Sequence, residues 1–352
     1  MSEFFSSRFG CLIPYTPGEQ PKDRKFIKLN TNESPFPPSP LALRMAREAA
    51  GDLQLYSDPE CTLLCEAGAD FFGIEKEQII FGNGSDELLA WAFMAFCDDD
   101  RPAVFADITY GFYKVFAEMA SVPYEEIALK EDFSIDIEDY MGGKKTVFLA
   151  NPNAPTALML PLSDIERLAA ENPGNLLVVD EAYVDFGAES AVPLINRYKN
   201  ILVVQTFSKS RSLAGGRLGM AMGSKELIRD LNTVKYSFNP YNVNRMTMAA
   251  GIGALRDEGY FRENCRKIMQ NRQWTMEELK KSGFELLDSK TNFIWAWHPD
   301  ISGKELYTKL REAGVLVRYF DKERLDAGVR ISVGDAEQMK IFIEEVKRIV
   351  KS

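Results

Sequence analysis

TFSKSRSLAGGRLG, residues 206–219, follows an apolar run and contains one lysine, a pair of glycines and two arginines. Lys209 stands between two serines, just past a segment that is predicted to be a buried strand. A lysine in a polar turn is usually an ordinary surface residue. In open α/β sheets, however, ligands bind outside the carboxyl ends of the strands. The residues at the other strand ends therefore decide whether Lys209 is functional.

Short apolar runs alternate with longer amphipathic segments through the middle of the chain. The runs are rich in β-branched and aromatic residues and are bounded by Gly, Pro, Asn or Asp, at residues 78–81, 103–106, 146–150, 176–180, 201–206 and 218–223. Segments with helical periodicity lie between them, for example at 86–96, 111–120 and 162–171. This alternation predicts an α/β fold with a mostly parallel central sheet covered by helices.

The character of the sequence changes at both ends of this region. Residues 1–40 are rich in proline, which disfavours helix interiors and central strands. After residue 254, long charged helical segments are followed by hairpin-like strands. We expect an N-terminal arm (1–40) that joins the small domain, a large α/β domain (41–254) and a small C-terminal α+β domain (255–352).

The composition argues against several classes of function. The formal net charge is -10, with 52 acidic and 42 basic residues, whereas a nucleic-acid partner requires a clustered basic surface. With five cysteines and one histidine, we expect neither a metal site nor a Ser-His-Asp triad. No apolar run approaches the ~20 residues that span a bilayer. The odd number of cysteines and the lack of a leader segment favour a soluble, cytoplasmic protein without a membrane partner.

Residues suited to bind an anion follow the first predicted strand. The segment GNGSDE (residues 82–87) places Gly84, Ser85 and Asp86 where a helix begins, so that free backbone N–H groups and the helix dipole face outward. Phosphate is the usual occupant of such a site. The alternative is a simple helix cap formed by Ser85.

An acid and an amine follow the next strands. Asp180 ends the apolar run 176–180, and an acid in this place is costly unless it meets a cation or hydrogen-bond donors. Lys209 follows the run 201–206, and Arg217 stands in the same loop. One edge of the sheet would then hold a phosphate cradle, a buried acid, the aromatic ring of Tyr110 and one nucleophilic amine. Pyridoxal 5'-phosphate needs all of these.

The order of the motifs along the chain extends this interpretation. IPYTPGEQP, LNTNESPFPPSP, LYSDPE, GNGSDE, TYGFY, NPNAPT, VVDEAYVDF, TFSKSRSLAGGRLG and RISVG cover nearly the whole sequence. In this order they resemble the fold type I pyridoxal-phosphate aminotransferases, and most closely the histidinol-phosphate aminotransferase family.

The resemblance implies a role for each cofactor-binding residue. Lys209 resembles the lysine that forms a Schiff base with the cofactor and later carries the α-proton of the substrate. Asp180 resembles the carboxylate that pairs with the pyridine nitrogen. Tyr183 resembles the donor to the phenolic oxygen of the cofactor, and Tyr110 resembles the aromatic residue that stacks on its ring.

The phosphate of the cofactor would be held mainly by the helix start and by the loop after the lysine strand. The residues implied are Gly84, Ser85, Asp86, Thr206, Ser208 and Arg217. Tyr56 in LYSDPE resembles a residue that reaches this phosphate across a subunit interface. We therefore expect a homodimer in which Tyr56 completes the neighbouring site.

The resemblance also implies substrate contacts. Arg330 in RISVG matches an arginine that binds the α-carboxylate of the amino donor with two parallel hydrogen bonds, a task to which lysine is poorly suited. Arg318 and Tyr15 match positions that meet the phosphate or the body of histidinol phosphate. The alternative for Arg318 is a solvated strand residue.

The turn NPNAPT departs from the family pattern. The family has a second asparagine where this chain has Ala154, and a glycine where it has Ala157. The missing asparagine contacts the phenolic oxygen of the cofactor, so either Asn153 replaces it or Tyr183 carries the contact alone. The loss of one hydrogen bond to a charged oxygen would cost about 1.5 to 3 kcal/mol.

These observations predict an enzyme that binds pyridoxal 5'-phosphate and acts on amino acid and 2-oxo acid substrates. The resemblance points to transfer of the amino group of histidinol phosphate to 2-oxoglutarate. A threonine-phosphate decarboxylase, or an aminotransferase for aromatic or other amino acids, would share the same cofactor motifs. A cofactor-sensing transcription regulator is disfavoured, because we expect no helix-turn-helix domain ahead of the arm.

Overall fold

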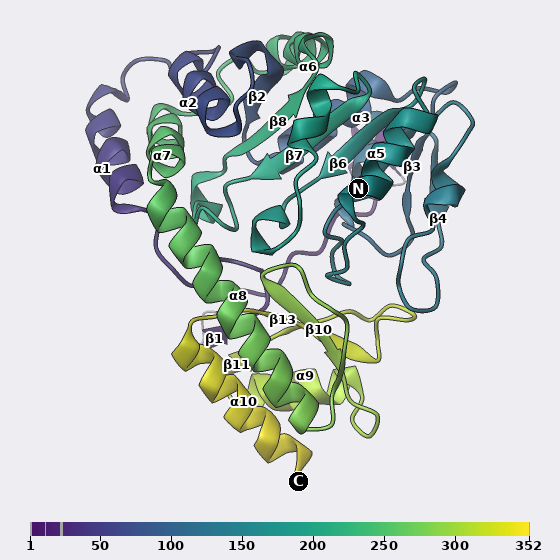
Figure 1. The fold of residues 1–352 in the computed structure, drawn as a ribbon, viewed down its shortest axis with the longest axis vertical. Helices are drawn as coiled ribbons and strands as arrows, with labels where there is room; N and C mark the ends of the chain where they lie inside the picture. The colour runs from purple at the N-terminus through teal and green to yellow at the C-terminus, as the bar shows by residue number, and fades with distance from the viewer. Residues whose placement is uncertain (1, 11, 22–23, 352) are drawn as a thin grey trace.

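A computed structural model describes residues 2–10, 12–21 and 24–351. Its central feature is a seven-stranded sheet with the order β2-β8-β7-β6-β5-β3-β4 (Figure 1). The strands are β2 (Ile79–Gly82), β3 (Ala103–Ala106), β4 (Tyr124–Ile127), β5 (Thr146–Ala150), β6 (Leu176–Asp180), β7 (Ile201–Thr206) and β8 (Gly219–Gly223). Neighbouring strands from β4 to β7 are parallel, whereas β8 is antiparallel to both β2 and β7. The prediction of a mostly parallel sheet is confirmed.

The strands of this sheet bury side chains on both faces. Along β6, Leu177 and Val179 belong to the core cluster that includes residues of α2 (Thr62–Phe72), α5 (Leu162–Glu171) and α7 (Arg245–Arg256). Leu176 and Val178 belong to the opposite cluster, with residues of α3 (Ser85–Phe96), α4 (Phe112–Ala120) and α6 (Lys225–Phe238). Because side chains alternate along a strand, Asp180 at the end of β6 faces the second cluster and therefore α4.

A second, smaller layer lies below the large sheet in Figure 1. It contains a four-stranded antiparallel sheet in the order β12-β13-β10-β9. The strands are β9 (Glu285–Leu286), β10 (Phe293–Trp297), β12 (Arg318–Tyr319) and β13 (Gly328–Ser332), and the covering helices include α8 (Glu258–Lys281), α9 (Gly303–Glu312) and α10 (Ala336–Val350). Helix α8 runs from the large sheet to this layer (Figure 1).

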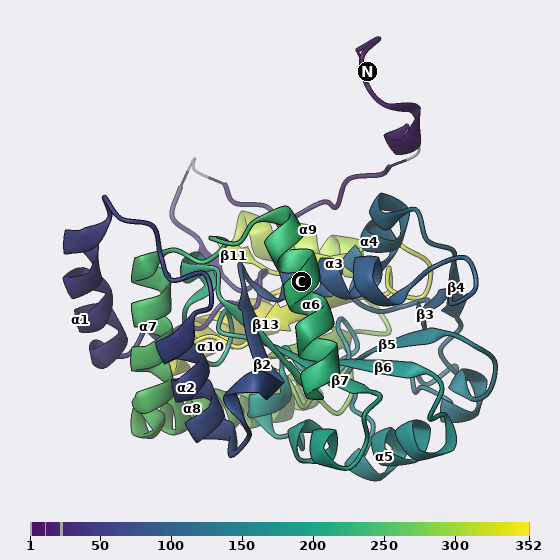
Figure 2. The same ribbon diagram turned by 90° about the horizontal axis from the view of Figure 1, so that it is seen from above.

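The N-terminal segment joins the smaller layer. Strand β1 (Ile27–Lys28) pairs in parallel with β11 (Val315–Leu316), and Leu29 is buried in the core cluster of the C-terminal part. The first residues of the chain extend away from the body of the molecule (Figure 2). Helix α1 (Pro40–Ala49) then leads into the large sheet. The domain limits at residues 40 and 254 stay a prediction.

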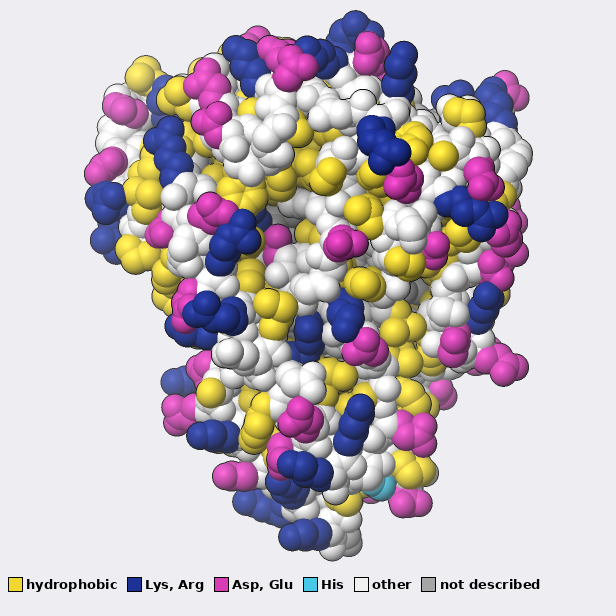
Figure 3. All heavy atoms as spheres, in the orientation of Figure 1, with side chains coloured by type: hydrophobic (Ala, Val, Ile, Leu, Met, Phe, Trp, Pro, Cys, Tyr) yellow, Lys and Arg dark blue, Asp and Glu magenta, His cyan; other side chains and the backbone are white. Residues whose placement is uncertain are grey.

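Charged side chains of both signs are spread over the surface. In the face shown in Figure 3, Lys and Arg side chains are interspersed with Asp and Glu. No helix in the described part of the chain is long and apolar enough to cross a membrane. Within residues 2–10, 12–21 and 24–351, no group of three or more His, Cys, Asp or Glu side chains could hold a metal ion.

Candidate active site

Two cavities share a wall at the carboxyl edge of the large sheet. The first has a volume of about 390 Å³, and the second, which opens toward β12 and β13, has a volume of about 450 Å³. The residues that line both are Thr31, Tyr110, Ala154, Tyr183 and Lys209. Strands β6 and β7 are direct neighbours, with Asp180 opposite Val204, so the sheet brings the acid and the loop of Lys209 to the same cavity.

Close backbone packing shapes one end of the first cavity. Gly84 precedes α3 with a φ of +83°, and a Cβ atom there would lie 2.6 Å from Nη2 of Arg217. A Cβ atom on Gly219 would lie 2.4 Å from the backbone nitrogen of Ser85. Glycine is needed at position 84 because of the positive φ, and at position 219 because any side chain would push β8 away from the start of α3. The sequence analysis identified Gly84 but missed Gly219.

Hydrogen-bond donors converge at this end. Arg217 directs Nη1 to the Ser208 hydroxyl at 3.5 Å and Nη2 to Asp86 at 3.3 Å, while Thr206 and Ser208 share a hydrogen bond of 3.0 Å. The second oxygen of Asp86 accepts a hydrogen bond from the Tyr110 hydroxyl at 2.7 Å. A guanidinium, two hydroxyls and a helix N-terminus form a site suited to a phosphate group.

A buried acid lies at the other end of the same cavity. Burial raises the pKa of Asp180 to about 6, although hydrogen bonds from the Tyr113 hydroxyl (2.8 Å) and the Ala182 amide (3.2 Å) oppose this rise. Tyr113 comes from α4 and is fully buried. The sequence analysis quoted Tyr113 within TYGFY without giving it a role. Its position three residues after Tyr110, on a helix covering the face of Asp180, is the signal that could have found it.

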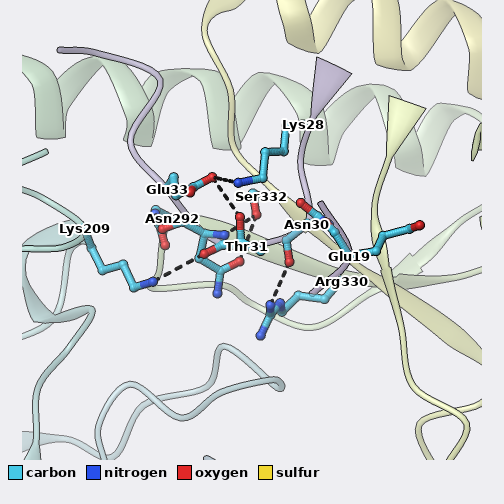
Figure 4. Close-up of polar contacts among 10 residues, drawn as sticks. Glu19, Lys28, Asn30, Thr31, Glu33, Lys209, Asn292, Arg330 and Ser332 are labelled. Carbon is cyan, nitrogen blue, oxygen red and sulfur yellow. Dashed lines mark hydrogen bonds and ion pairs between the residues drawn. The ribbon is translucent and has the colours of Figure 1, made fainter. Parts of the chain in front are cut away.

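Lys209 is part of the wall shared by the two cavities. Its Nζ donates a hydrogen bond of 3.4 Å to the carbonyl oxygen of Thr31 and lies 5.8 Å from the centre of the Tyr183 ring (Figure 4). Among the described residues, Lys209 has no carboxylate within ion-pair distance. The amine is therefore held near the cavity by one weak, replaceable contact.

Arg330 is a partly buried cation in the second cavity. Nη2 donates to the carbonyl oxygen of Asn30 at 3.1 Å, and the guanidinium lies 5.3 Å and 5.5 Å from the ring centres of Phe293 and Phe320. Burial lowers the pKa of Arg330. Its Nε atom has no hydrogen-bond partner, and no carboxylate of the described residues pairs with it. A partly buried arginine without an anion is costly unless a ligand supplies one.

Arg318 and Tyr15 line the outer part of the second cavity. Arg318 donates to the carbonyl oxygens of Thr16 and Pro17 at 3.0 Å and 3.2 Å. Tyr15 stacks on Phe112 with 4.3 Å between ring centres. The two residues suggested for the substrate thus lie beside Arg330.

Three predicted site residues line neither cavity, namely Gly84, Asn153 and Tyr56. The Asn153 side chain donates to the Ile108 carbonyl and the Thr156 hydroxyl and accepts from Thr109, so its polar atoms are used by the turn and by the loop after β3. Ala154 lines both cavities instead. Tyr56 is 79% exposed and stacks on Tyr241 at 4.6 Å. The structure of one chain does not bring Tyr56 to its own cavity.

The segment 30–32 was not predicted to belong to the site. Its three residues each hold one functional side chain: the Asn30 carbonyl holds Arg330, the Thr31 carbonyl holds Lys209, and the Asn32 side chain amide donates to the Tyr183 hydroxyl at 3.0 Å. Figure 4 shows Lys209 and Arg330 converging on this segment from opposite sides.

Comparison with known proteins agrees with this geometry. Residues 24–346 match the family of class I and II aminotransferases. A histidinol-phosphate aminotransferase of Clostridium botulinum (strain Langeland) is 47% identical over 351 residues, which are 99% of this chain and 99% of the relative. The chain belongs to the histidinol-phosphate aminotransferase family. A further member of this family, from Brachyspira hyodysenteriae, is 47% identical over 354 residues and the full length of both chains.

A solved structure of this family has the same fold. Histidinol-phosphate aminotransferase from Sinorhizobium meliloti, in complex with pyridoxal-5'-phosphate, has a TM-score of 0.89 and 25% identity, over 100% of this chain and 98% of its own. The predicted fold type I architecture is therefore confirmed. The predicted enzyme class is confirmed too: this member of the family is an aminotransferase.

Proposed function

We propose that the first cavity binds pyridoxal 5'-phosphate and that the second binds histidinol phosphate, whose amino group is transferred to 2-oxoglutarate. The observation that supports this proposal is the shared wall, where Lys209 lies between the cavity lined by Ser208 and Arg217 and the cavity lined by Arg330. The chemistry of the residues fits the cofactor: a glycine-shaped anion site lies at one end and a buried acid at the other.

The cofactor, when bound, supplies a covalent link to the amino group and an electron-withdrawing ring. Asp180 would be ionised at neutral pH and would hold a proton on the ring nitrogen. Lys209 would accept the α-proton of the substrate as a general base and give it back as a general acid. Tyr110 would cover the ring, and Tyr183 would donate to its phenolic oxygen. Ser85, Thr206, Ser208 and Arg217 would hold the phosphate.

Arg330 would bind the carboxylate of glutamate or 2-oxoglutarate with two parallel hydrogen bonds. Histidinol phosphate has no carboxylate, and its phosphate would be held near Arg318 and Tyr15 in the outer cavity. The support for this donor is the 47% identity over 99% of both chains with a histidinol-phosphate aminotransferase.

We also propose that the active unit is a homodimer. Large apolar side chains are exposed together around the segment 53–63 and the end of α6, namely Leu53, Leu55, Tyr56, Leu63, Phe238 and Tyr241. Solvent contact of so much apolar surface is unfavourable, and a second copy of this chain would cover it. Tyr56 would then lie at the interface and reach the phosphate of the partner's site.

The location proposed for the enzyme is the cytoplasm. The cysteines in the described part of the chain, Cys61, Cys65, Cys97 and Cys265, are unpaired. Unpaired cysteines suit a reducing compartment, where disulfides do not persist. Cys11 lies outside the described residues.

The test is an incubation of the cofactor-loaded protein with histidinol phosphate and 2-oxoglutarate. Formation of glutamate and imidazole acetol phosphate, lost in the Lys209→Ala variant, is the expected result. Release of carbon dioxide from phosphothreonine would instead show a decarboxylase. Faster glutamate formation from an aromatic amino acid than from histidinol phosphate would show a different aminotransferase.

A further inference from the structure

The hydroxyl of Tyr183 is held by a side chain from the N-terminal segment. Asn32 Nδ2 donates to Tyr183 Oη at 3.0 Å, so the phenol oxygen acts as an acceptor in this contact. In the described part of the chain, no acceptor takes up the proton of Tyr183 itself. Tyr183 lines both cavities, and its hydroxyl proton therefore has an acceptor only if a ligand provides one.

The direction of the Asn32 amide follows from its other contacts. The backbone N–H of Asn32 donates to the Ser332 hydroxyl at 2.8 Å, so the proton of that hydroxyl is free to donate to Asn32 Oδ1, 2.9 Å away. The carbonyl side of the amide thus faces Ser332, and the NH₂ side faces Tyr183. With the amide reversed, the Ser332 hydroxyl would lose the only acceptor that its proton has among the described residues, because Nδ2 can only donate.

Asn32 is also fixed in place. The residue is 1% exposed, and its backbone carbonyl oxygen accepts a hydrogen bond of 3.0 Å from the Asn292 side chain. The backbone has a φ of +55°, a conformation that asparagine adopts more readily than most residues. Asn292 and Ser332 belong to the smaller layer, and Figure 4 shows them beside Thr31. The smaller layer therefore sets the orientation of the Tyr183 hydroxyl, although Tyr183 itself follows β6 of the large sheet.

The wall around Tyr183 offers little else to an oxygen of the ligand. Ala154 has no polar side-chain atom, and the amide of Asn153 is used by Ile108 and Thr156. We propose that Asn32 is a positioning residue that holds Tyr183 as the hydrogen-bond donor to the phenolic oxygen of the cofactor. This inference rests on the proposed function.

The test compares Asn32→Asp with the wild-type protein, both loaded with pyridoxal 5'-phosphate. The carboxylate keeps the contact with Ser332 but accepts the proton of Tyr183, which turns the donor away from the cavity. The Tyr183 hydroxyl would stabilise the phenolic oxygen of the cofactor most when the nitrogen of Lys209, joined to the cofactor, has lost its proton. Its loss should therefore raise the pH midpoint of the change in visible absorption of the bound cofactor, by about one to two pH units.

The added charge must be separated from the loss of the donor. Tyr183→Phe should raise the midpoint by a similar amount, and Asn32→Asp should add little in the Tyr183→Phe background. Asn30→Asp places the same charge two residues earlier, away from Tyr183, and its shift should be smaller. Asn32→Gly suits the positive φ, adds no charge and should give a partial rise, because the Tyr183 hydroxyl becomes free to rotate.

Each result decides between two accounts. An equal shift from Asn32→Asp with and without the Tyr183 hydroxyl would overturn the inference, since the effect would then be one of charge alone. An unchanged midpoint in both Asn32→Asp and Asn32→Gly would overturn it as well. If the wild-type protein shows no visible band with the cofactor, the proposed function fails first.

Discussion

Replacing Asp180 by asparagine should stabilise the protein in the absence of cofactor. Burial raises the pKa of this carboxyl from 3.8 to about 6, and each unit corresponds to 1.36 kcal/mol. Because the folded protein binds this proton more tightly than the unfolded chain does, stability is lost as the pH rises from about 4 through 6. The ionised carboxylate thus costs about 3 kcal/mol at neutral pH.

The asparagine variant removes this cost and loses one hydrogen bond. Its single carbonyl oxygen can still accept from Tyr113, but its NH₂ group would then face the amide of Ala182. A lost bond of this kind costs about 1 kcal/mol, so the variant should be about 2 kcal/mol more stable at pH 8. Below pH 4, where the carboxyl is protonated and this cost is absent, only the lost bond remains, so the variant should be about 1 kcal/mol less stable than the wild type. Burial also raises the pKa of the neighbouring Glu181, but that effect is common to both proteins.

The assay is equilibrium unfolding in urea of both cofactor-free proteins between pH 4 and pH 8. With the cofactor bound the order should reverse, because the carboxylate then has a cationic partner. A cofactor-free Asp180→Asn protein that is no more stable than the wild type at pH 8 would refute the reasoning, as would a difference that does not change with pH.

Three further substitutions test separate parts of the site. Arg330→Lys should lower kcat/KM for glutamate about 10- to 100-fold, because lysine cannot form the bidentate contact; steady-state kinetics with unchanged values would contradict this. Gly219→Ala should destabilise the protein by about 1–3 kcal/mol and weaken cofactor binding, since the new Cβ meets the backbone of Ser85 at 2.4 Å; urea unfolding and a cofactor titration measure both, and wild-type values would be the contrary result. Tyr113→Phe should raise the pKa of Asp180 further, so the fall in stability of the cofactor-free protein with rising pH should extend to higher pH; urea unfolding measures this, and an unchanged fall would show that the bond at 2.8 Å has no electrostatic effect.

The sequence predicted the buried strands of the large sheet closely. The runs 103–106, 146–150, 176–180 and 201–206 coincide with β3, β5, β6 and β7, because strands covered on both faces leave uninterrupted apolar segments. Strand β4 was missed. Its sequence YEEI is largely exposed at the sheet edge and lacks such a run. The antiparallel direction of β8 also leaves no mark in the composition of that strand.

The site could be predicted where side chains follow strand ends. Asp180, Lys209 and Arg217 meet at one cavity because neighbouring strands share one edge. The contacts of the segment 30–32 could not be foreseen in this way. Two of them use backbone carbonyl oxygens, which every residue has, and they join parts of the chain separated by 178 and 300 positions. Such pairings become visible only once both sheets are placed in space.

The exposed Tyr56 illustrates the same limit. Its ring stacks on Tyr241 at the surface, so the role proposed for it depends on a second chain rather than on its own fold. In the sequence, only the family resemblance suggests that Tyr56 completes the site of a second subunit. The exposed apolar side chains around Tyr56 support the proposed homodimer.

Reduction of the cofactor-loaded protein with borohydride, followed by peptide mapping, tests the central claim most directly. The account predicts that the reduced cofactor stays attached to one peptide, the one that contains Lys209, and that the Lys209→Ala protein retains none. Attachment to a different lysine, or an unchanged adduct in the Lys209→Ala protein, would contradict it.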